Sequence, residues 1–473
     1  MRVTLSLISH TNVGKTTLAR TLLRRDVGDA LDQPHVTDVN EAHTMVESRD
    51  HELVLWDTPG FGDSARLLAR LKLSDNPVVW FLSQMWDRFA DRPLWCGQQA
   101  VKNVRDEADV VLYLINAAED PAAAGYVGME MQILGWIGKP VAVLLNQTGQ
   151  PAPAERLKAD AERWREHLKA WDCVKDVVSL DAYSRCWVQE DLLLARLGKL
   201  LPADRTKAFA TLADAWRRKN AAAFDASVAA IAAELAASAS DAAEVPEQTF
   251  LEKLGLDRRR VKAEMEAARR ELGERLARRV EESTDALIAA NGLEGKAARG
   301  AADLSQGSFG VPEKVNEPAW TAIGGLAGGA STGLVADILH GGMTFGGGAI
   351  VGGLAGAASA YIIAKGFNLA KGQGNTVRWS QAHFRKQFQL ALLRYLAIAH
   401  YGRGRDPWEE GTIPEFWQRL AESATELQRR QLEQAWKKAG TEKRAGIEAD
   451  LAKAFHRAAE QILKRIYPEW DGA

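Results

Sequence analysis

The chain has 473 residues, of which 46% are hydrophobic and 26% charged, with 60 Lys and Arg against 62 Asp and Glu. This length predicts several domains, and a net charge of −2 excludes overall attraction to polyanions, so we predict no nucleic-acid partner. The three widely separated cysteines exclude a disulfide framework and indicate a reducing, cytoplasmic location.

Residues 1–200 alternate short β-branched runs with helical stretches. This alternation predicts an α/β domain with a mostly parallel sheet covered by helices on both faces. The predicted strands are Arg2–Ile8, Glu52–Trp56, Asp109–Ile115, Pro140–Asn146 and Val177–Leu180.

A phosphate-binding loop follows the first predicted strand. The pattern G-x-x-x-x-G-K-S/T is present with serine in place of the first glycine, and a predicted helix follows it directly. Its residues are Ser9, His10, Thr11, Asn12, Val13, Gly14, Lys15 and Thr16, with Thr17 next in the helix. The backbone N–H groups of such a loop wrap phosphate oxygens, its lysine contacts the terminal phosphates, and its hydroxyl binds Mg²⁺.

A second motif, Asp57-Thr58-Pro59-Gly60, ends the strand Glu52–Trp56 about 40 residues after the lysine. An aspartate at this position holds Mg²⁺ through water, and the Gly60 N–H meets the terminal phosphate. The same four residues also suit an ordinary turn. The strand, the spacing and the P-loop together favour the nucleotide site.

These two motifs resemble those of the Era-like branch of translation-factor-related GTPases, whose P-loop reads N-V-G-K-S/T and whose second motif is D-T-P-G. The resemblance covers about 180 residues and implies GTP and GDP as ligands and Mg²⁺ as cofactor. It also implies a Mg²⁺-binding threonine in the first switch segment, for which Thr37 is the candidate and Thr44 the rival.

The base-recognition motif departs from this family. The expected N-K-x-D reads Asn146-Gln147-Thr148-Gly149, so the aspartate that accepts two hydrogen bonds from guanine is absent. In the next loop, Ser179 and Asp181 occupy the place of the fifth motif. Asp181 either replaces part of the missing acid or serves a turn or a helix cap.

The residue after the D-x-x-G motif is Phe61, which cannot orient a water molecule as glutamine does. In similar GTPases with a hydrophobic residue there, a K⁺ ion bound through the P-loop asparagine, here Asn12, or dimerisation supplies the missing charge. We therefore predict slow hydrolysis stimulated by K⁺, with a nucleotide-dependent homodimer as the other source of charge.

A long insertion separates Gly60 from the strand beginning at Asp109, and it is rich in aromatic residues. It is interpreted either as a helix packed against the helical domain or as a docking surface. The aromatic residues are Trp80, Phe81, Trp86, Phe89 and Trp95.

The rest of the chain is predicted to form an all-α domain in two parts, 201–312 and 373–473, interrupted by a Gly-rich segment, 313–372. Residues 319–364 carry one formal charge, Asp337, and are long enough for two membrane-crossing helices. Glycines at four-residue intervals would let the two helices approach closely. We predict a helical hairpin that contacts lipid or a membrane protein at the cytoplasmic face of the inner membrane, with a soluble core as the alternative.

This order of parts resembles a bacterial family of Era-like GTPases with a C-terminal helical domain of unknown function. The leading hypothesis is a slow GTPase whose nucleotide state controls the helical domain and its hairpin. The alternatives are a nucleotide-binding membrane scaffold or pore-forming effector with little hydrolysis, and an NTPase of relaxed base specificity.

Overall fold

The computed structural model describes residues 1–10, 13–24, 40–73, 75–83, 91–149, 151–244, 258–293, 367–370, 376–402, 413–439 and 443–472. The chain divides into two compact units. The first comprises Met1–Ala221, His400–Asp406 and Ile466–Asp471; the second comprises Ala222–Ala399, Pro407–Arg465 and Gly472–Ala473.

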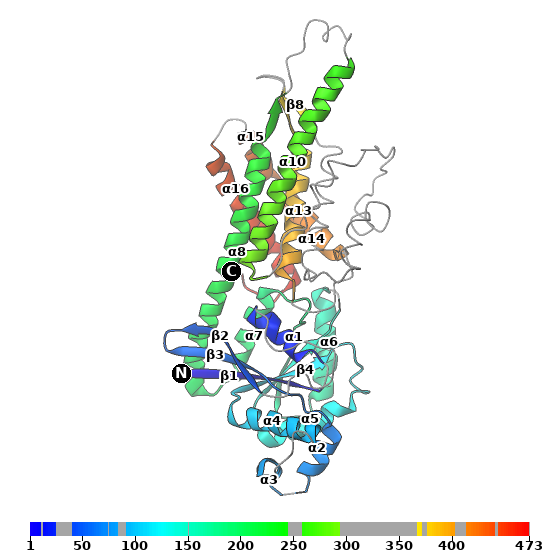
Figure 1. The fold of residues 1–473 in the computed structure, drawn as a ribbon, viewed down its shortest axis with the longest axis vertical. Coiled ribbons are helices and arrows are strands. Elements are labelled where there is room, and N and C mark those ends of the chain that lie inside the picture. The colour runs from blue at the N-terminus through cyan, green and yellow to red at the C-terminus, as the bar shows by residue number, and fades with distance from the viewer. Residues whose placement is uncertain are drawn as a thin grey trace. The chain divides into compact units, whose positions relative to one another are not determined.

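The first unit is built on a six-stranded sheet with the order β2-β3-β1-β4-β5-β6 (Figure 1). The strands are β1 (Arg2–Ser9), β2 (Glu41–Ser48), β3 (His51–Asp57), β4 (Val110–Asn116), β5 (Val141–Asn146) and β6 (Val174–Ser179). The five strands other than β2 run parallel to one another, and β2 pairs antiparallel with β3. The carboxyl ends of the parallel strands therefore meet at one edge of the sheet, which brings the four predicted motifs together.

All five predicted strands are present, and β2 is the one that the sequence interpretation missed. It is an edge strand whose residues are half-buried or exposed, and charged residues at Glu41 and Glu47 interrupt its apolar alternation. Such a strand gains its place from backbone pairing with β3 more than from burial, so its sequence gives a weak signal.

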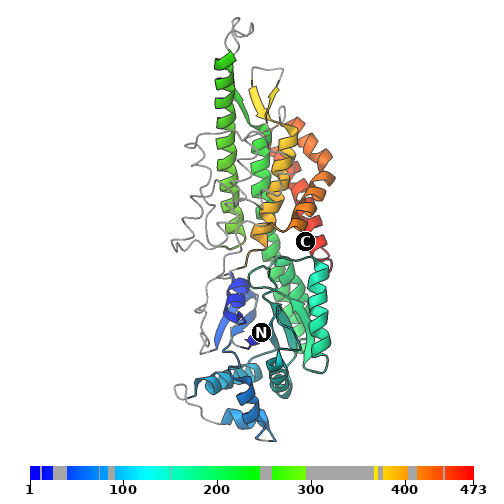
Figure 2. The ribbon, with the colours of Figure 1, turned by 90° about the vertical axis from the view of Figure 1, so that its right-hand side faces the viewer.

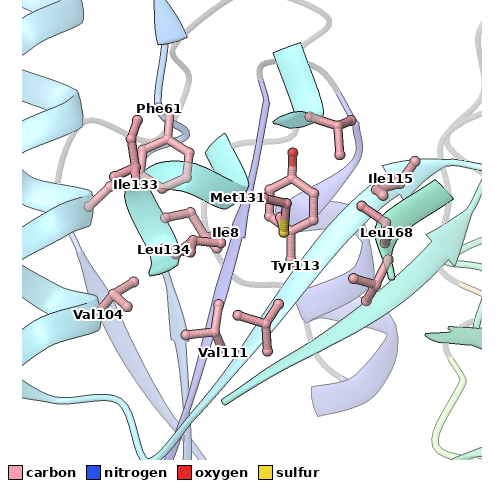
Figure 3. Packing of buried hydrophobic residues seen from close by; sticks show 14 of the residues in the cluster. Ile8, Phe61, Val104, Val111, Tyr113, Ile115, Met131, Ile133, Leu134 and Leu168 are labelled. Carbon is pink, nitrogen blue, oxygen red and sulfur yellow. The ribbon is translucent and has the colours of Figure 1, made fainter. Parts of the chain in front are cut away.

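Helices cover both faces of this sheet. Side chains alternate between the two faces along each strand, so apolar residues of one strand enter two separate cores. On β4, Val111, Tyr113 and Ile115 enter one core, while Leu112 and Leu114 enter the other. Figure 3 shows the first of these cores. Its helices are α2 (Ser64–Leu71), α3 (Pro77–Ser83), α4 (Arg92–Asp106), α5 (Gly125–Ile137) and α6 (Ala154–Leu168). The other core contains α1 (Lys15–Leu23), α7 (Trp187–Leu197) and the first part of α8 (Ala203–Ser240).

The aromatic-rich insertion contributes α2, α3 and α4. Their buried residues, including Leu67 and Val101, pack in the core of the first unit's own sheet. Trp95 lies half-buried in α4, whereas Trp86 and Phe89 and the side chains of Trp80 and Phe81 lie outside the described residues. The insertion is therefore, in its described part, a helical layer of the sheet domain.

The second unit is a helical assembly in which α8, α10, α13 and α16 run side by side in both views (Figures 1 and 2). Besides α8, its helices are α10 (Arg258–Ala290), α13 (Gln381–Ala399), α14 (Glu415–Leu427), α15 (Arg429–Lys438) and α16 (Arg444–Ile466). Phe388, Tyr395 and Phe455 pack edge to face in its core. A buried ion pair between Arg394 and Glu234 joins α13 to α8.

The helical unit also holds a small antiparallel sheet that the all-α prediction did not anticipate. Its order is β7 (Ala242–Glu244), β9 (Thr376–Trp379) and β8 (Phe367–Ala370). The predicted hairpin, 319–364, lies outside the described residues. Among the helices the structure describes, α8 alone is long and apolar enough to cross a membrane, and 56% of its most apolar stretch is buried. This property is common in core helices and is weak evidence for a span.

Candidate functional site

The candidate site lies at the carboxyl edge of the parallel strands, where the loop after β1 leads into α1. Gly14 directly precedes α1 and has a φ of 88°, in the left-handed region that disfavours residues with a side chain. A Cβ atom at Gly14 would lie 2.8 Å from the amide nitrogen of Asn146. Both the backbone conformation and the space therefore require glycine at this point of the loop.

The D-T-P-G turn lies directly against the P-loop. The Phe61 N–H donates a hydrogen bond of 3.2 Å to the Ser9 carbonyl oxygen. A Cβ atom at Gly60 would lie 2.8 Å from that oxygen and 3.1 Å from Nζ of Lys15. Lys15 Nζ in turn donates to Ser9 Oγ at 3.2 Å. The predicted phosphate ligands Lys15 and Gly60 are thus adjacent.

Thr16 and Asp57, the predicted Mg²⁺ ligands, are brought together. Thr16 Oγ1 donates to Asp57 Oδ2 at 2.7 Å, and Asp57 Oδ1 is buried with no hydrogen-bond partner among the described residues. Burial raises the pKa of the Asp57 carboxyl and lowers that of the Lys15 ammonium, although Asp57 and Glu130 partly offset the effect on Lys15. A hydroxyl and a carboxylate with an unpaired buried oxygen are ligands that Mg²⁺ accepts. No cluster of three or more His, Cys, Asp or Glu suited to a metal occurs in the described part of the chain.

Asn146 is fully buried at the end of β5 and connects two loops. Its Nδ2 donates to the Val13 carbonyl oxygen at 2.7 Å, and its Oδ1 accepts from the Ala182 N–H at 2.8 Å. The next residue, Gln147, has a φ of 57°, which is unusual for a residue other than glycine. The amide thus fixes the P-loop to the loop after β6.

Asp181 makes its hydrogen bonds to neighbouring loops. Its carboxylate accepts from the Thr148 N–H, from Thr148 Oγ1 at 2.9 Å and from the Tyr183 N–H at 2.7 Å. Burial raises the pKa of this carboxyl. Of the two roles predicted for Asp181, these contacts match the turn role. Ser179 Oγ donates to the Leu157 carbonyl oxygen at 3.4 Å.

The remaining predicted residues divide into two groups. Thr17 lies half-buried in α1, and Thr44 lies in β2, paired with Val54 of β3. Thr11, Asn12 and Thr37 lie outside the described residues, and with them the K⁺ prediction.

Phe61 is completely buried, in the core shown in Figure 3, where it lies beside Ile133. Its ring therefore fills space between the D-x-x-G turn and α5. This burial agrees with the prediction that residue 61 does not orient water.

Sequence reasoning missed a polar group next to the P-loop. His10 Nδ1 lies 2.8 Å from Oε1 of Glu130, a fully buried residue of α5. Ser64 and Tyr113 also donate to the Glu130 carboxylate. A signal was present, because Glu130 is the one charged residue in the apolar sequence Gly125–Ile137.

Residues 4–147 match the family described as 50S ribosome-binding GTPase. This match confirms the predicted P-loop GTPase domain at the N-terminus, and it covers less than a third of the chain. Comparison with curated proteins finds no match.

Several solved structures are similar at low identity. A variant of Aquifex aeolicus Era bound to GDP and AlF4⁻ is 20% identical with a TM-score of 0.32, over 42% of this chain and 57% of that one. Era in complex with MgGDPNP and nucleotides 1506–1542 of 16S ribosomal RNA is 19% identical with a TM-score of 0.30, over the same shares. A variant of S. thermophilus NFeoB bound to GMPPNP is 16% identical with a TM-score of 0.25, over 44% of this chain and 77% of that one. The chain thus spans little more than half the length of the two Era proteins, and no functional inference rests on these likenesses.

Proposed function

Because the N-terminal part of this chain is a P-loop GTPase domain, we propose that the protein binds GTP and GDP with Mg²⁺ and hydrolyses GTP slowly. The observation that carries this proposal is the meeting of two motifs. Thr16 lies 2.7 Å from Asp57, and Lys15 lies beside Gly60. A loop of backbone amides, a cation and a metal-binding pair in one place suit a nucleoside triphosphate.

Each residue then has a defined part in binding. The N–H groups of the P-loop are proposed to surround the phosphates, while the Lys15 ammonium binds the terminal phosphate oxygens. Thr16 and Asp57 would hold Mg²⁺, which would supply positive charge beside the phosphates, and Thr37 is the proposed third protein ligand. The Gly60 N–H faces the terminal phosphate.

Slow hydrolysis is supported by the burial of Phe61 in the apolar core. Because the Phe61 side chain cannot orient the attacking water, GTP hydrolysis depends on positive charge supplied by another group. We propose K⁺ bound through Asn12 as the first source and a second copy of the chain as the other.

The base site supports weak discrimination between GTP and ATP. The Asn146 side chain is held by hydrogen bonds to Val13 and Ala182, so the position of the loop after β5 is fixed at this residue. Gly149 stands where the guanine-binding aspartate would be, and the carboxylate of Asp181 is already bonded to Thr148 and Tyr183. The proposed preference for guanine therefore rests on Gln147, Ser179 and backbone groups, with fewer charged hydrogen bonds than an N-K-x-D site makes.

Nucleotide state is proposed to control the helical region through α8, a 38-residue helix that begins in the first unit and continues in the second. Arg24, at the end of α1, donates to Glu190 of α7 at 3.2 Å and to Asn220 of α8. Trp216 of α8 donates to the same Glu190 carboxylate at 2.9 Å. A buried network thus joins the helix after the P-loop to the helix that enters the second unit.

The end of the first unit makes a second connection. The Gly402 N–H, just after α13, donates to the Tyr183 carbonyl oxygen at 3.1 Å, in the loop that Asn146 holds. Trp470, just after α16, packs edge to face on Trp187. On the basis of these contacts within the first unit, we propose that the two chain segments returning from the helical region respond to nucleotide state.

We further propose that residues 319–364 contact the inner membrane, on the basis of their composition alone. Flotation of the full-length protein with anionic liposomes tests this proposal, with Gly329→Glu as the variant that places a charge in the apolar run. Binding by the wild type that the variant loses would support it. Equal recovery of both proteins in the liposome fraction, or none of either, would refute it.

The proposed activity is tested by measuring steady-state GTP hydrolysis with saturating Mg²⁺, in K⁺ and in Na⁺. We expect slow turnover that K⁺ increases and Lys15→Ala abolishes. Because the base site is proposed to discriminate weakly, we also expect ATP to inhibit at concentrations only moderately above those of GTP. The second candidate, a nucleotide-binding scaffold, predicts saturable GTP binding with no turnover under either cation. Equal rates in K⁺ and Na⁺ would contradict the role of Asn12.

A further inference from the structure

A buried carboxylate stands behind the P-loop. Glu130 of α5 has no exposed surface, and its carboxylate contacts polar groups from three other parts of the first unit. Burying a carboxylate costs free energy unless hydrogen-bond donors surround it. The partners of Glu130 therefore offset the cost of removing its carboxylate from water.

The two oxygens of this carboxylate bind different kinds of structure. Oε2 accepts from the hydroxyl of Tyr113 at 2.5 Å, and Tyr113 belongs to the central strand β4 (Figure 3). Oε1 accepts from Ser64 Oγ and lies 2.8 Å from Nδ1 of His10. One oxygen is therefore bound to the sheet, while the other joins the P-loop to the first residue of α2.

His10 is held at this point by a second contact. Its ring stacks on Tyr126, with centroids 4.4 Å apart, and the Tyr126 hydroxyl donates to Glu119 at 2.8 Å. Ser64 Oγ also lies 3.3 Å from Nδ1 of His10. The imidazole, the hydroxyl and the carboxylate thus form a closed group of three, and the stacking fixes the plane of the ring.

Ser64 connects this group to the D-x-x-G turn. Ser64 begins α2, four residues after Gly60, so anchoring Ser64 limits where the D-x-x-G turn can lie. That turn is already tied to the P-loop by the hydrogen bond from Phe61 N–H to Ser9. These two connections, at Phe61 and at Ser64, limit how far the D-x-x-G turn, and with it the Gly60 N–H, can move relative to the P-loop.

We propose that Glu130 is a positioning residue for GTP hydrolysis, which holds the D-x-x-G turn in register with the P-loop by binding Ser64 and His10 together. This inference rests on the proposed GTPase function. It predicts an effect on the chemical step, because the terminal phosphate of GTP is the part of the nucleotide that faces the turn. GDP lacks that phosphate, so its affinity depends on the P-loop and not on the position of α2.

The test compares Ser64→Ala and Glu130→Gln with Tyr113→Phe. Ser64→Ala removes the link between the P-loop and α2, and Glu130→Gln weakens it by replacing the carboxylate with a neutral amide that has one acceptor oxygen. Tyr113→Phe removes a hydrogen bond to the same carboxylate from the sheet side. Single-turnover hydrolysis, GDP affinity and thermal midpoint are measured for each full-length protein. We expect Ser64→Ala and Glu130→Gln to lower the hydrolysis rate about tenfold, the value of one hydrogen bond to a charged group, with GDP affinity changed less than about twofold. In the double variant the two losses should not add.

Tyr113→Phe is expected to lower the thermal midpoint while keeping the hydrolysis rate within about twofold of wild type, because the Oε1 contacts remain. A Ser64→Ala variant with the wild-type rate would overturn the inference, as would a Tyr113→Phe variant that loses as much activity as Ser64→Ala. Absence of GTP hydrolysis by the wild type would refute the proposed activity itself, before any variant is compared.

Discussion

Asn146 shows how one side chain connects two loops of the site. Its donor end binds Val13 of the P-loop and its acceptor end binds Ala182 in the loop after β6. We predict that Asn146→Ala lowers stability by about 1–3 kcal/mol, since it leaves a buried carbonyl and a buried N–H without partners. Asn146→Asp keeps the acceptor for Ala182 but replaces the donor to Val13 with a buried carboxylate oxygen that faces the Val13 carbonyl oxygen, so it should weaken GDP binding and lower stability at least as much. Urea unfolding and GDP titration check both variants, and equal stability of Asn146→Ala and wild type would contradict this role.

Gly402 lies where the chain re-enters the first unit, at a position that has no space for a side chain. A Cβ atom there would collide with the backbone of Ala182 and Tyr183. We therefore predict that Gly402→Ala destabilises the protein by about 1–3 kcal/mol, because the contact is to backbone that cannot turn aside.

Gly446 provides the matched control for this change. It lies in the first turn of α16 with open space where its Cβ would be. Gly446→Ala should be neutral or stabilising by up to about 1 kcal/mol, through helix propensity. Thermal unfolding distinguishes the two alanines, and similar melting temperatures would show that the Gly402 contact is not tight.

The chemistry of the site could be predicted from the sequence where it depends on local motifs. Lys15, Thr16, Asp57 and Gly60 each follow a strand that the sequence identifies, and parallel strands bring such residues to one edge. Glu130 could not be placed in this way. Its partners come from β4, α2 and the P-loop, and no spacing in the sequence shows that these segments converge.

At the scale of elements, the buried parallel strands were predictable and the edge strand was not. β4 and β5 read as continuous apolar runs because both their faces are covered. β2, β7, β8 and β9 are short or partly exposed, and backbone pairing with another strand determines them more than burial does. For α7, the sequence does not indicate that two adjacent acids, Glu190 and Asp191, are both buried against α8.

Asp191 makes the folding stability depend on pH, and it lies where α7 packs against α8. Burial raises its pKa to about 6, and its Oδ2 has no hydrogen-bond partner in the described structure. Because the folded-state pKa exceeds the unfolded value, the associated stability is fully present below about pH 4 and is lost as pH rises through about 6. Asp191→Asn removes this dependence. We predict that, as pH rises from about 5 to about 8, the free energy of unfolding of the variant increases by about 1 kcal/mol relative to that of wild type. Urea unfolding at the two pH values checks this, and parallel pH profiles would contradict it.

At the scale of the whole molecule, α8 is the continuous element that belongs to both units. We predict that Ala222→Pro, at an exposed position where the second unit begins, interrupts this helix at a cost of about 3 kcal/mol, whereas Ala222→Gly costs about 1 kcal/mol and leaves it intact. If α8 transmits nucleotide state, GTP should change hydrogen exchange in α10 and α13 of wild type and Ala222→Gly but not of Ala222→Pro. An undiminished response in Ala222→Pro would exclude α8 as the route.

The most direct test of the account is titration of the full-length wild-type protein and Lys15→Ala with a fluorescent GTP analogue in Mg²⁺. We predict saturable binding by the wild type, displaced by GTP and GDP, and an affinity reduced at least about tenfold in Lys15→Ala, because the ammonium beside Gly60 forms charge-assisted hydrogen bonds to phosphate. Absence of saturable binding to the wild type, or equal affinity of the two proteins, would contradict the assignment of this site to a nucleoside triphosphate.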